Sequence, residues 1–187
     1  MNFQEAVQAV LDITKRPDKK VDTERAVNSA LSFFHTNARF DQDRTETSLA
    51  IPADTLAGTV SISTLLRFRV FAVIKARNNR IPLSKIDPAN LFSPDAITQV
   101  NKYYVAGTDL TYILAVSDTI LDCLYYTYPA ILAGVETDWM LEAIPSSIID
   151  RAASTIFKQI GDDTSFQIHN GLAIEVFKSF LRDKEQP

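Results

Sequence analysis

Apolar residues recur at helical spacing near both ends of the chain and alternate with polar residues in its middle. The most regular helical pattern follows Pro145, which suits the first turn of a helix, and ends at Gly161, which suits a helix end. Its apolar face consists of Ile149, Ala152, Ala153, Ile156, Phe157 and Ile160. Just before it, Asp138 is placed to cap a short helical turn. This stretch predicts a core helix on which the other elements pack.

Both ends of the chain supply further predicted helices. Asn2 followed by Glu5 is typical of a capping box at the start of a first helix. A second helix is expected to begin at its cap, Asp22, and to end near His35. A last helix is expected from about Thr164, leaving only the residues LRDKEQP as a tail. The predicted apolar face of this helix consists of Leu172, Ala173, Val176, Phe177, Phe180 and Leu181.

The middle of the chain has the alternation of apolar and polar residues that is typical of half-buried strands. The predicted strands cover residues 45–51, 59–75, 103–105, 110–116 and 120–128. The turn sequence Ala106-Gly107-Thr108-Asp109 joins the third and fourth of them as a hairpin. Asp87-Pro88 indicates a short helical turn before the hairpin.

This order of elements places the chain in the α+β class, as a helical bundle from N- and C-terminal helices with an inserted antiparallel β subdomain. We expect a single domain over residues 1–187. Residues 1–40 and 138–183 would form the bundle, and residues 41–130 the β subdomain. Trp139 stands where the last strand gives way to the helices, which predicts that it is largely buried between the two parts.

Composition narrows the class of protein. The chain is 46% hydrophobic, but it has no apolar run of about 20 residues and no signal-peptide pattern at its start, so we expect a cytoplasmic place of synthesis. Its single cysteine, Cys123, excludes an internal disulfide and is expected to be a small buried apolar residue. The net charge of −4 gives no overall attraction to nucleic acid or to an anionic membrane, and no membrane partner is expected.

Catalytic chemistry has no positive signal in the sequence. The only histidines are His35 and His169, and neither has ligand spacing to the other. A histidine in the last turn of a helix, as predicted for His35, is favourable there without any catalytic role. Five glycines in the whole chain do not form a phosphate-binding loop. We therefore expect no enzyme activity, no catalytic or metal-binding residues and no cofactor.

One segment is locally basic, since it contains no acidic residue before Asp87. Its cations are Arg67, Arg69, Lys75, Arg77, Arg80 and Lys85. They are candidate contacts to the phosphates of DNA or to acidic residues of a neighbouring subunit. The remaining alternative is a solvated strand face and loop.

Several short stretches, in the same order along the chain, resemble the head-to-tail adaptor (connector) proteins of tailed bacteriophages. They are Asn28–His35, Ile86–Phe92, Tyr103–Gly107, Tyr125–Pro129, Trp139–Leu141 with Pro145, and Gly161–Asp163. They extend over most of the chain, and none is a catalytic signature. The chain departs from some of these proteins in having only a short tail after its last helix.

The resemblance implies a structural virion protein at the neck of the phage. Its implied partners are the portal protein, a tail nozzle or other tail protein, and further copies of itself in a dodecameric ring on the portal. Double-stranded DNA would pass through the ring during genome ejection without sequence-specific contacts. The alternative suggested by the basic segment 67–85 is a nucleic-acid-binding module.

Overall fold

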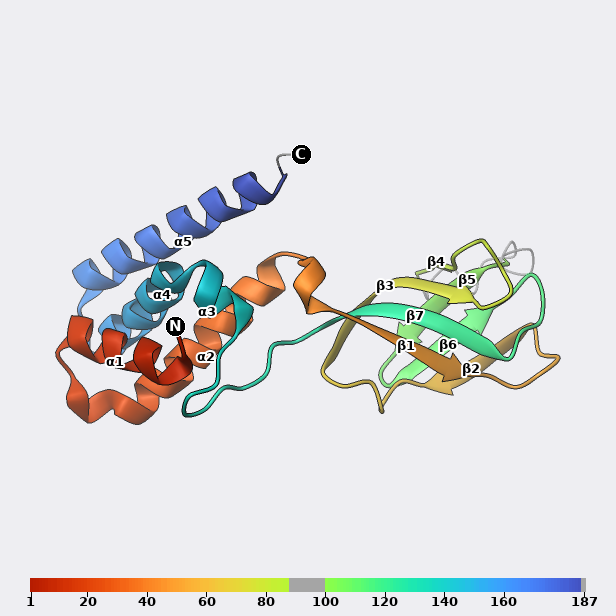
Figure 1. Cartoon of the computed structure of the whole chain (residues 1–187), viewed down its shortest axis with the longest axis horizontal. Helices are drawn as coiled ribbons and strands as arrows, with labels where there is room; N and C mark the ends of the chain where they lie inside the picture. The colour runs from red at the N-terminus through yellow and green to blue at the C-terminus, as the bar shows by residue number, and fades with distance from the viewer. Residues whose placement is uncertain (88–99, 186–187) are drawn as a thin grey trace. The chain divides into compact units, whose positions relative to one another are not determined.

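The computed structural model describes residues 1–87 and 100–185. The chain divides into two compact units, a helical unit of Met1–Gln42 with Pro129–Pro187 and a β unit of Asp43–Tyr128 (Figure 1). Each unit contains its own cluster of buried apolar side chains. The α+β class predicted from the sequence is confirmed. The helical unit includes residues 129–137, of which the predicted division placed 129 and 130 in the β subdomain and left 131–137 unassigned.

The helical unit is organised around one buried helix, as predicted. Its helices are α1 (Phe3–Thr14), α2 (Lys20–Asn37), α3 (Trp139–Ala143), α4 (Pro145–Gln159) and α5 (Asp163–Glu185). Helix α4 packs against α1, α2 and α5. The apolar face of α4 includes Ala152, Ala153 and Ile156, each fully buried. Ser154 is also buried, although the sequence pattern predicts it on the polar side of the helix. Its hydroxyl donates a hydrogen bond to the Arg151 carbonyl.

Local signals set most of the helix ends correctly. Asn2 and Glu5 form the predicted capping box, with both hydrogen bonds at 2.9 Å. Asp138 accepts a hydrogen bond from the Met140 N–H at 2.8 Å, as expected of a cap. Gly161 adopts the left-handed conformation, with φ at 79°.

Other helix predictions are wrong in detail. Asp22 does not cap α2, because the short 3-10 turn Pro17–Lys19 leads directly into a helix that begins at Lys20. Asp22 lies in the first turn instead, 3.1 Å from the ammonium group of Lys19. In α5, Leu172 is 44% exposed and does not belong to the buried face. The helix continues to Glu185, so most of the predicted tail is helical.

Trp139 packs within the helical unit and is half-buried. Its ring lies edge-on to His35, with 5.3 Å between ring centroids, and to Phe40 at 5.0 Å. The ring of Phe180 lies 6.5 Å away on α5. Trp139 therefore belongs to an aromatic cluster of the helical unit.

The described part of the β unit consists of two sheets. The first has the order β1-β7-β3, from Arg44–Ala50, Ile120–Thr127 and Phe68–Ala76. The second has the order β2-β6-β5-β4, from Ala57–Ser61, Asp109–Ile113, Lys102–Ala106 and Ser84–Lys85. Among the residues that the structure describes, all strand pairs are antiparallel except β4 and β5, which are parallel. The predicted hairpin is confirmed as β5–β6, turning at Gly107 with φ at 59°, although its second strand ends at Ile113.

The single strand predicted over residues 59–75 is in fact two strands that pair in different sheets. Strand β2 pairs with β6, whereas β3 pairs with β7. Between them the chain turns, and Arg67 adopts a left-handed conformation with φ at 49°. The alternating pattern is the same on both sides of the turn, so it indicates strand without indicating the partner. The helical turn predicted at Asp87-Pro88 lies outside the described residues, because Pro88 is not among them.

Candidate functional site

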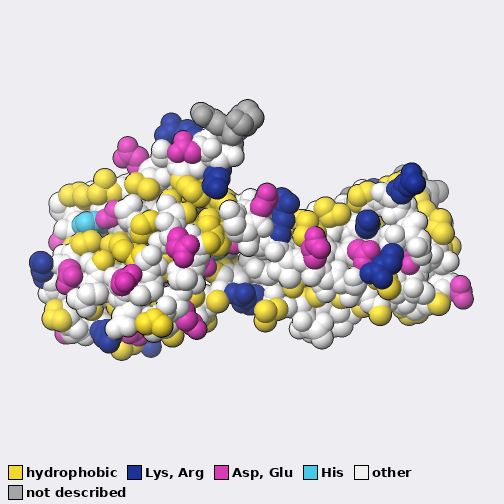
Figure 2. All heavy atoms as spheres, viewed as in Figure 1, with side chains coloured by type: hydrophobic (Ala, Val, Ile, Leu, Met, Phe, Trp, Pro, Cys, Tyr) yellow, Lys and Arg dark blue, Asp and Glu magenta, His cyan; other side chains and the backbone are white. Residues whose placement is uncertain are grey.

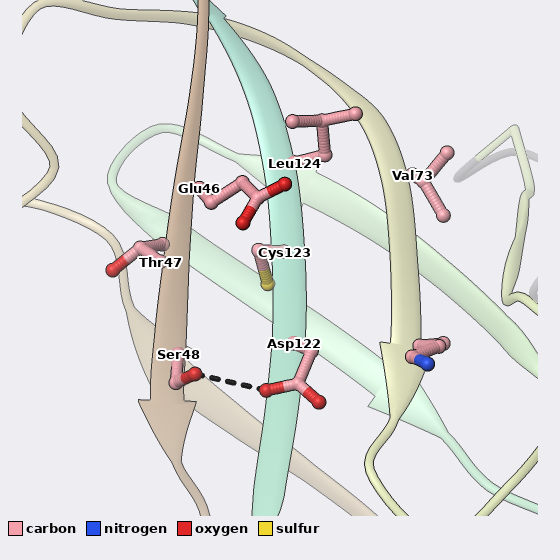
Figure 3. Close-up of a pocket in the computed structure, with 8 residues that line it drawn as sticks. Glu46, Thr47, Ser48, Val73, Asp122, Cys123 and Leu124 are labelled. Carbon is pink, nitrogen blue, oxygen red and sulfur yellow. Dashed lines mark hydrogen bonds between the residues drawn. The ribbon is translucent and has the colours of Figure 1, made fainter.

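The outer face of the β1-β7-β3 sheet is the surface on which part of the basic segment lies. The strand register places Ser48 of β1 and Lys75 of β3 on either side of Asp122 of the central strand. Together with Glu46 and Val73 these residues line a shallow pocket of about 550 Å³ on this face (Figure 3). Charges of both signs therefore meet on one solvent-facing sheet surface.

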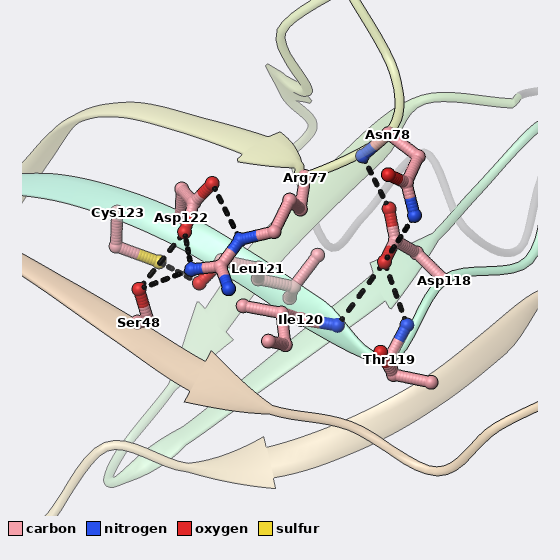
Figure 4. A network of polar contacts seen from close by, with 9 residues as sticks. All are labelled: Ser48, Arg77, Asn78, Asp118, Thr119, Ile120, Leu121, Asp122 and Cys123. Atoms are coloured by element: carbon pink, nitrogen blue, oxygen red, sulfur yellow. Dashed lines mark hydrogen bonds and ion pairs between the residues drawn. The ribbon is translucent and has the colours of Figure 1, made fainter.

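Arg77 is not a free cation, because it pairs with Asp122 (Figure 4). One guanidinium nitrogen, Nη2, donates to Asp122 Oδ1 at 2.7 Å and to Ser48 Oγ at 3.0 Å. Ser48 in turn donates to the same carboxylate oxygen at 2.8 Å. These hydrogen bonds, that of Arg77 first, hold the pKa of Asp122 below its usual range, and the pKa of Arg77 is raised in return. The side chains are 47% and 31% exposed, so the pair contributes little to stability.

Asp118 is a second acidic group beside the end of the basic segment (Figure 4). Its carboxylate is buried and accepts hydrogen bonds from the backbone N–H groups of Asn78 and Thr119, both at 2.7 Å, and of Ile120 at 3.3 Å. The hydrogen bond from Asn78 is the largest cause of a lowered pKa for Asp118. This residue ties the turn after β3 to the start of β7.

The six cations of the basic segment do not form one patch. Arg67 precedes β3 and Arg80 follows it, and a strand of nine residues separates its ends by about 30 Å. Lys75 and Arg77 lie beside Asp122, as described above. Arg69 and Lys85 line a separate pocket of about 190 Å³ with aromatic side chains of β3 and β5. Tertiary structure therefore spreads the basic segment over several places and brings Asp122 of β7 to Arg77. That its cations contact DNA or a neighbouring subunit stays a prediction.

Both histidines pair with aspartates in the helical unit. His35 is 2% exposed, and its Nε2 lies 3.0 Å from Asp138 Oδ1. His169 Nδ1 lies 2.7 Å from Asp150 Oδ1, and its ring stacks on Phe157 with 5.2 Å between centroids. Asp138 is the N-cap of α3 and Asp150 lies in α4, 103 and 19 residues from the histidines in sequence, so local patterns give no signal for these pairs. Within residues 1–87 and 100–185, His, Cys, Asp and Glu form no group of three that would hold a metal ion.

Cys123 is buried in β7, 3% exposed, as the sequence predicts. Burial raises the pKa of its thiol to about 12, so at neutral pH the thiolate needed for nucleophilic chemistry is essentially absent. The residue acts as a small apolar side chain of the β-unit core.

No protein-family model matches the sequence, and no curated protein is similar enough to count as a relative. No helix in the described part of the chain is long and apolar enough to cross a membrane.

Proposed function

We propose that this protein is a structural component of a phage virion, a head-to-tail adaptor that forms a ring between the portal and the tail. The observation that carries the proposal is where the stretches with family resemblance lie in the fold. Two of them, Asn28–His35 and Trp139–Leu141, are far apart in sequence and pack directly on one another in the helical unit.

The contacts between these stretches are specific. His35 pairs with Asp138, the cap of the helix that contains Trp139, and the rings of His35 and Trp139 meet edge-on. At the other end of the first stretch, the Asn28 side chain bonds to the backbone of Leu132, just after the stretch Tyr125–Pro129. The two stretches therefore form one packed region of the helical unit, which is compatible with the architecture that the resemblance implies.

The charge distribution favours DNA passage over DNA binding. Asp122 neutralises Arg77, and the chain as a whole carries a net charge of −4. A surface that releases few counterions from DNA binds it weakly and lets it slide. This argument also weighs against the alternative, a nucleic-acid-binding module built on residues 67–85.

The test is to mix the purified protein with a portal ring and to image the mixture by negative stain. The adaptor function predicts an additional ring layer on one face of the portal, and failure to bind any portal contradicts it. Retention on double-stranded DNA, measured over a range of salt concentrations, tests the alternative. Steeply salt-dependent retention without portal binding would favour the nucleic-acid-binding module.

A further inference from the structure

Asn170 and Gly171 are neighbours near the middle of α5, and Asn170 is the only asparagine of the chain that glycine follows. Asparagine is a chemically labile residue. In an Asn-Gly pair the backbone nitrogen of the glycine can attack the side-chain amide carbon, because glycine has no side chain to hinder the approach and its backbone adopts many conformations. The chain therefore contains one pair whose chemistry favours deamidation.

Packing inside the subunit gives no reason for a glycine at position 171. Gly171 is exposed, and no atom beyond the local helix backbone lies within 4 Å of the place that a Cβ would occupy. Glycine is among the poorest residues for a helix interior, so it weakens α5 locally. Helix α5 forms an outer edge of the helical unit (Figure 1), where charged as well as hydrophobic side chains reach the surface (Figure 2). Water therefore has access to the pair.

Helix α4 holds α5 on both sides of this pair. Arg151 donates from Nη1 to Oδ1 of Asn170, so the amide is bound to the neighbouring helix. Beyond Gly171, the buried Ser147 donates from Oγ to the Ala173 carbonyl at 2.6 Å. In an α-helix each N–H also points along the axis to a carbonyl one turn earlier, and not at the preceding side chain. The folded helix therefore opposes the attack that the sequence favours.

We infer that Asn170 is a site of deamidation, and that the reaction proceeds when α5 opens around Gly171 and separates from α4. In the opened chain the nitrogen of Gly171 attacks Cγ of Asn170. The new N–Cγ bond closes a succinimide ring, the Cγ–Nδ2 bond breaks, and the amide nitrogen leaves as ammonia with the proton from the glycine nitrogen. Water then opens the ring at either carbonyl and gives aspartate or isoaspartate, so water is the co-reactant.

The two products affect the helix differently. Aspartate at position 170 keeps the backbone, and its carboxylate replaces the amide oxygen beside Arg151, which gives a charge-assisted hydrogen bond. Isoaspartate adds a carbon atom to the backbone and interrupts the helix ahead of Ala173 and Phe177, whose side chains belong to the buried core of the helical unit. The modification does not depend on the proposed adaptor function.

The test follows deamidation of the full chain by mass spectrometry, in native buffer and in guanidinium chloride at the same mildly alkaline pH. Trypsin cleaves after Lys158 and Lys178, so Asn170 is the only asparagine of its peptide. In guanidinium chloride Asn170 is expected to react before every other asparagine. In native buffer it is expected to react at least about tenfold more slowly, because only the opened helix reacts. Labelling with an isoaspartyl methyltransferase identifies the isoaspartate product.

Two results of this comparison would overturn the inference. Equal rates in the two solutions would mean that the folded helix does not protect Asn170. An Asn170 that stays intact in native buffer, while the same peptide reacts in guanidinium chloride, would mean that the folded protein has no such site.

Arg151→Met tests the part that α4 plays, because methionine keeps an apolar side chain over the Phe33 ring but cannot donate to Asn170. Its Asn170 is expected to react roughly threefold faster or more in native buffer, and at the wild-type rate in guanidinium chloride. Arg182→Met is the matched control, since Arg182 is an exposed cation of α5. It is expected to behave like the wild type in both solutions. An unchanged rate in Arg151→Met, or an equal acceleration in Arg182→Met, contradicts control by α4.

Gly171→Ala tests the chemistry separately from the fold. Its methyl group has open space, and alanine favours the helix, so this variant is expected to fold. The fast reaction of Asn170 is expected to be lost in both solutions, because the methyl group hinders the attacking nitrogen. Deamidation of this variant at the wild-type rate in guanidinium chloride would mean that the Asn-Gly pair is not the cause, and the inference fails.

Discussion

Asp118→Ala is expected to destabilise the β unit selectively. Asp118 is 5% exposed, and its carboxylate accepts hydrogen bonds from three backbone N–H groups, those of Asn78, Thr119 and Ile120. It thereby joins the turn after β3 to the first residues of β7, the central strand of its sheet. Truncation to alanine leaves those N–H groups without their acceptor in a mostly buried site.

The size of the effect follows from the geometry. Two of the hydrogen bonds are short, at 2.7 Å, and their acceptor is charged. A hydrogen bond to a charged group contributes roughly 1.5 to 3 kcal/mol to the free energy of unfolding. In the variant, water that enters the site accepts hydrogen bonds from the freed N–H groups and recovers part of this energy. We therefore expect a loss of about 2 to 4 kcal/mol in the free energy of unfolding of the β unit.

The pH dependence of this loss has a definite sign. Hydrogen bonds from the backbone, that of Asn78 first, lower the pKa of Asp118 in the folded state. A depressed folded-state pKa means that the stabilisation is complete above the unfolded-state pKa, about 3.9 for aspartate, and is lost as pH falls through the lower folded-state value. The difference between wild type and Asp118→Ala is therefore constant near neutral pH and shrinks only below about pH 4.

The chain contains natural probes that separate its two units. The only tryptophan, Trp139, belongs to the helical unit, whereas all six tyrosines lie within residues 103–128. Cys123 is buried in the β unit and reacts with a thiol reagent only when that unit opens. When reclosing is fast, the labelling rate follows the opening equilibrium, so a loss of about 3 kcal/mol accelerates labelling by roughly 100-fold or more.

Asp109→Ala is the control, since Asp109 is an exposed acid at the start of β6. It is expected to label at the wild-type rate, and in both variants the unfolding transition followed by Trp139 is expected to be unchanged. If Asp118→Ala labels Cys123 no faster than wild type, the hydrogen bonds of Asp118 do not hold the β unit together, and the reasoning fails.

Ile156→Ala removes a fully buried side chain of α4 and is expected to lower the free energy of unfolding, followed by Trp139 fluorescence, by about 2 to 5 kcal/mol. Lys158→Ala changes an exposed side chain of the same helix and is expected to leave that free energy unchanged. An Ile156 variant that melts like wild type yet fails to assemble would mean that this face is an interface. Gly58→Ala places a Cβ 2.6 Å from the hydroxyl oxygen of the buried Tyr112 and is expected to destabilise the β unit by about 1 to 3 kcal/mol. Tyr112→Phe is expected to give partial rescue, because the ring carbon Cζ stays 3.0 Å from the new Cβ. Absence of rescue in the double variant would point to another cause. Asp122→Asn is expected to leave Cys123 labelling nearly unchanged at neutral pH, because its ion pair with Arg77 is solvent-exposed, and a large acceleration would contradict that.

Short-range sequence signals are enough to predict the local features of this fold. The capping box of Asn2 and Glu5, the start of α4 at Pro145, its end at Gly161 and the hairpin around Gly107 all follow from backbone chemistry within a few residues. Helical periodicity also identified α4 as the core of the helical unit, because the spacing of apolar residues sets which face is buried.

The pairing of the strands and the meeting of opposite charges depend on contacts between residues that are distant in sequence. The alternation of apolar and polar residues indicates a strand and its two faces, but it does not indicate which strand pairs with it. Residues 59–75 therefore have the pattern of one strand, although β2 and β3 belong to different sheets. In the same way the basic segment has no acidic partner nearby in the sequence. Asp122 lies 45 residues from Arg77 and comes into contact with it because β3 pairs with β7. The contact of His35 with Asp138 spans 103 residues. Interactions at such separations depend on the packing of the whole chain, and no local pattern records them.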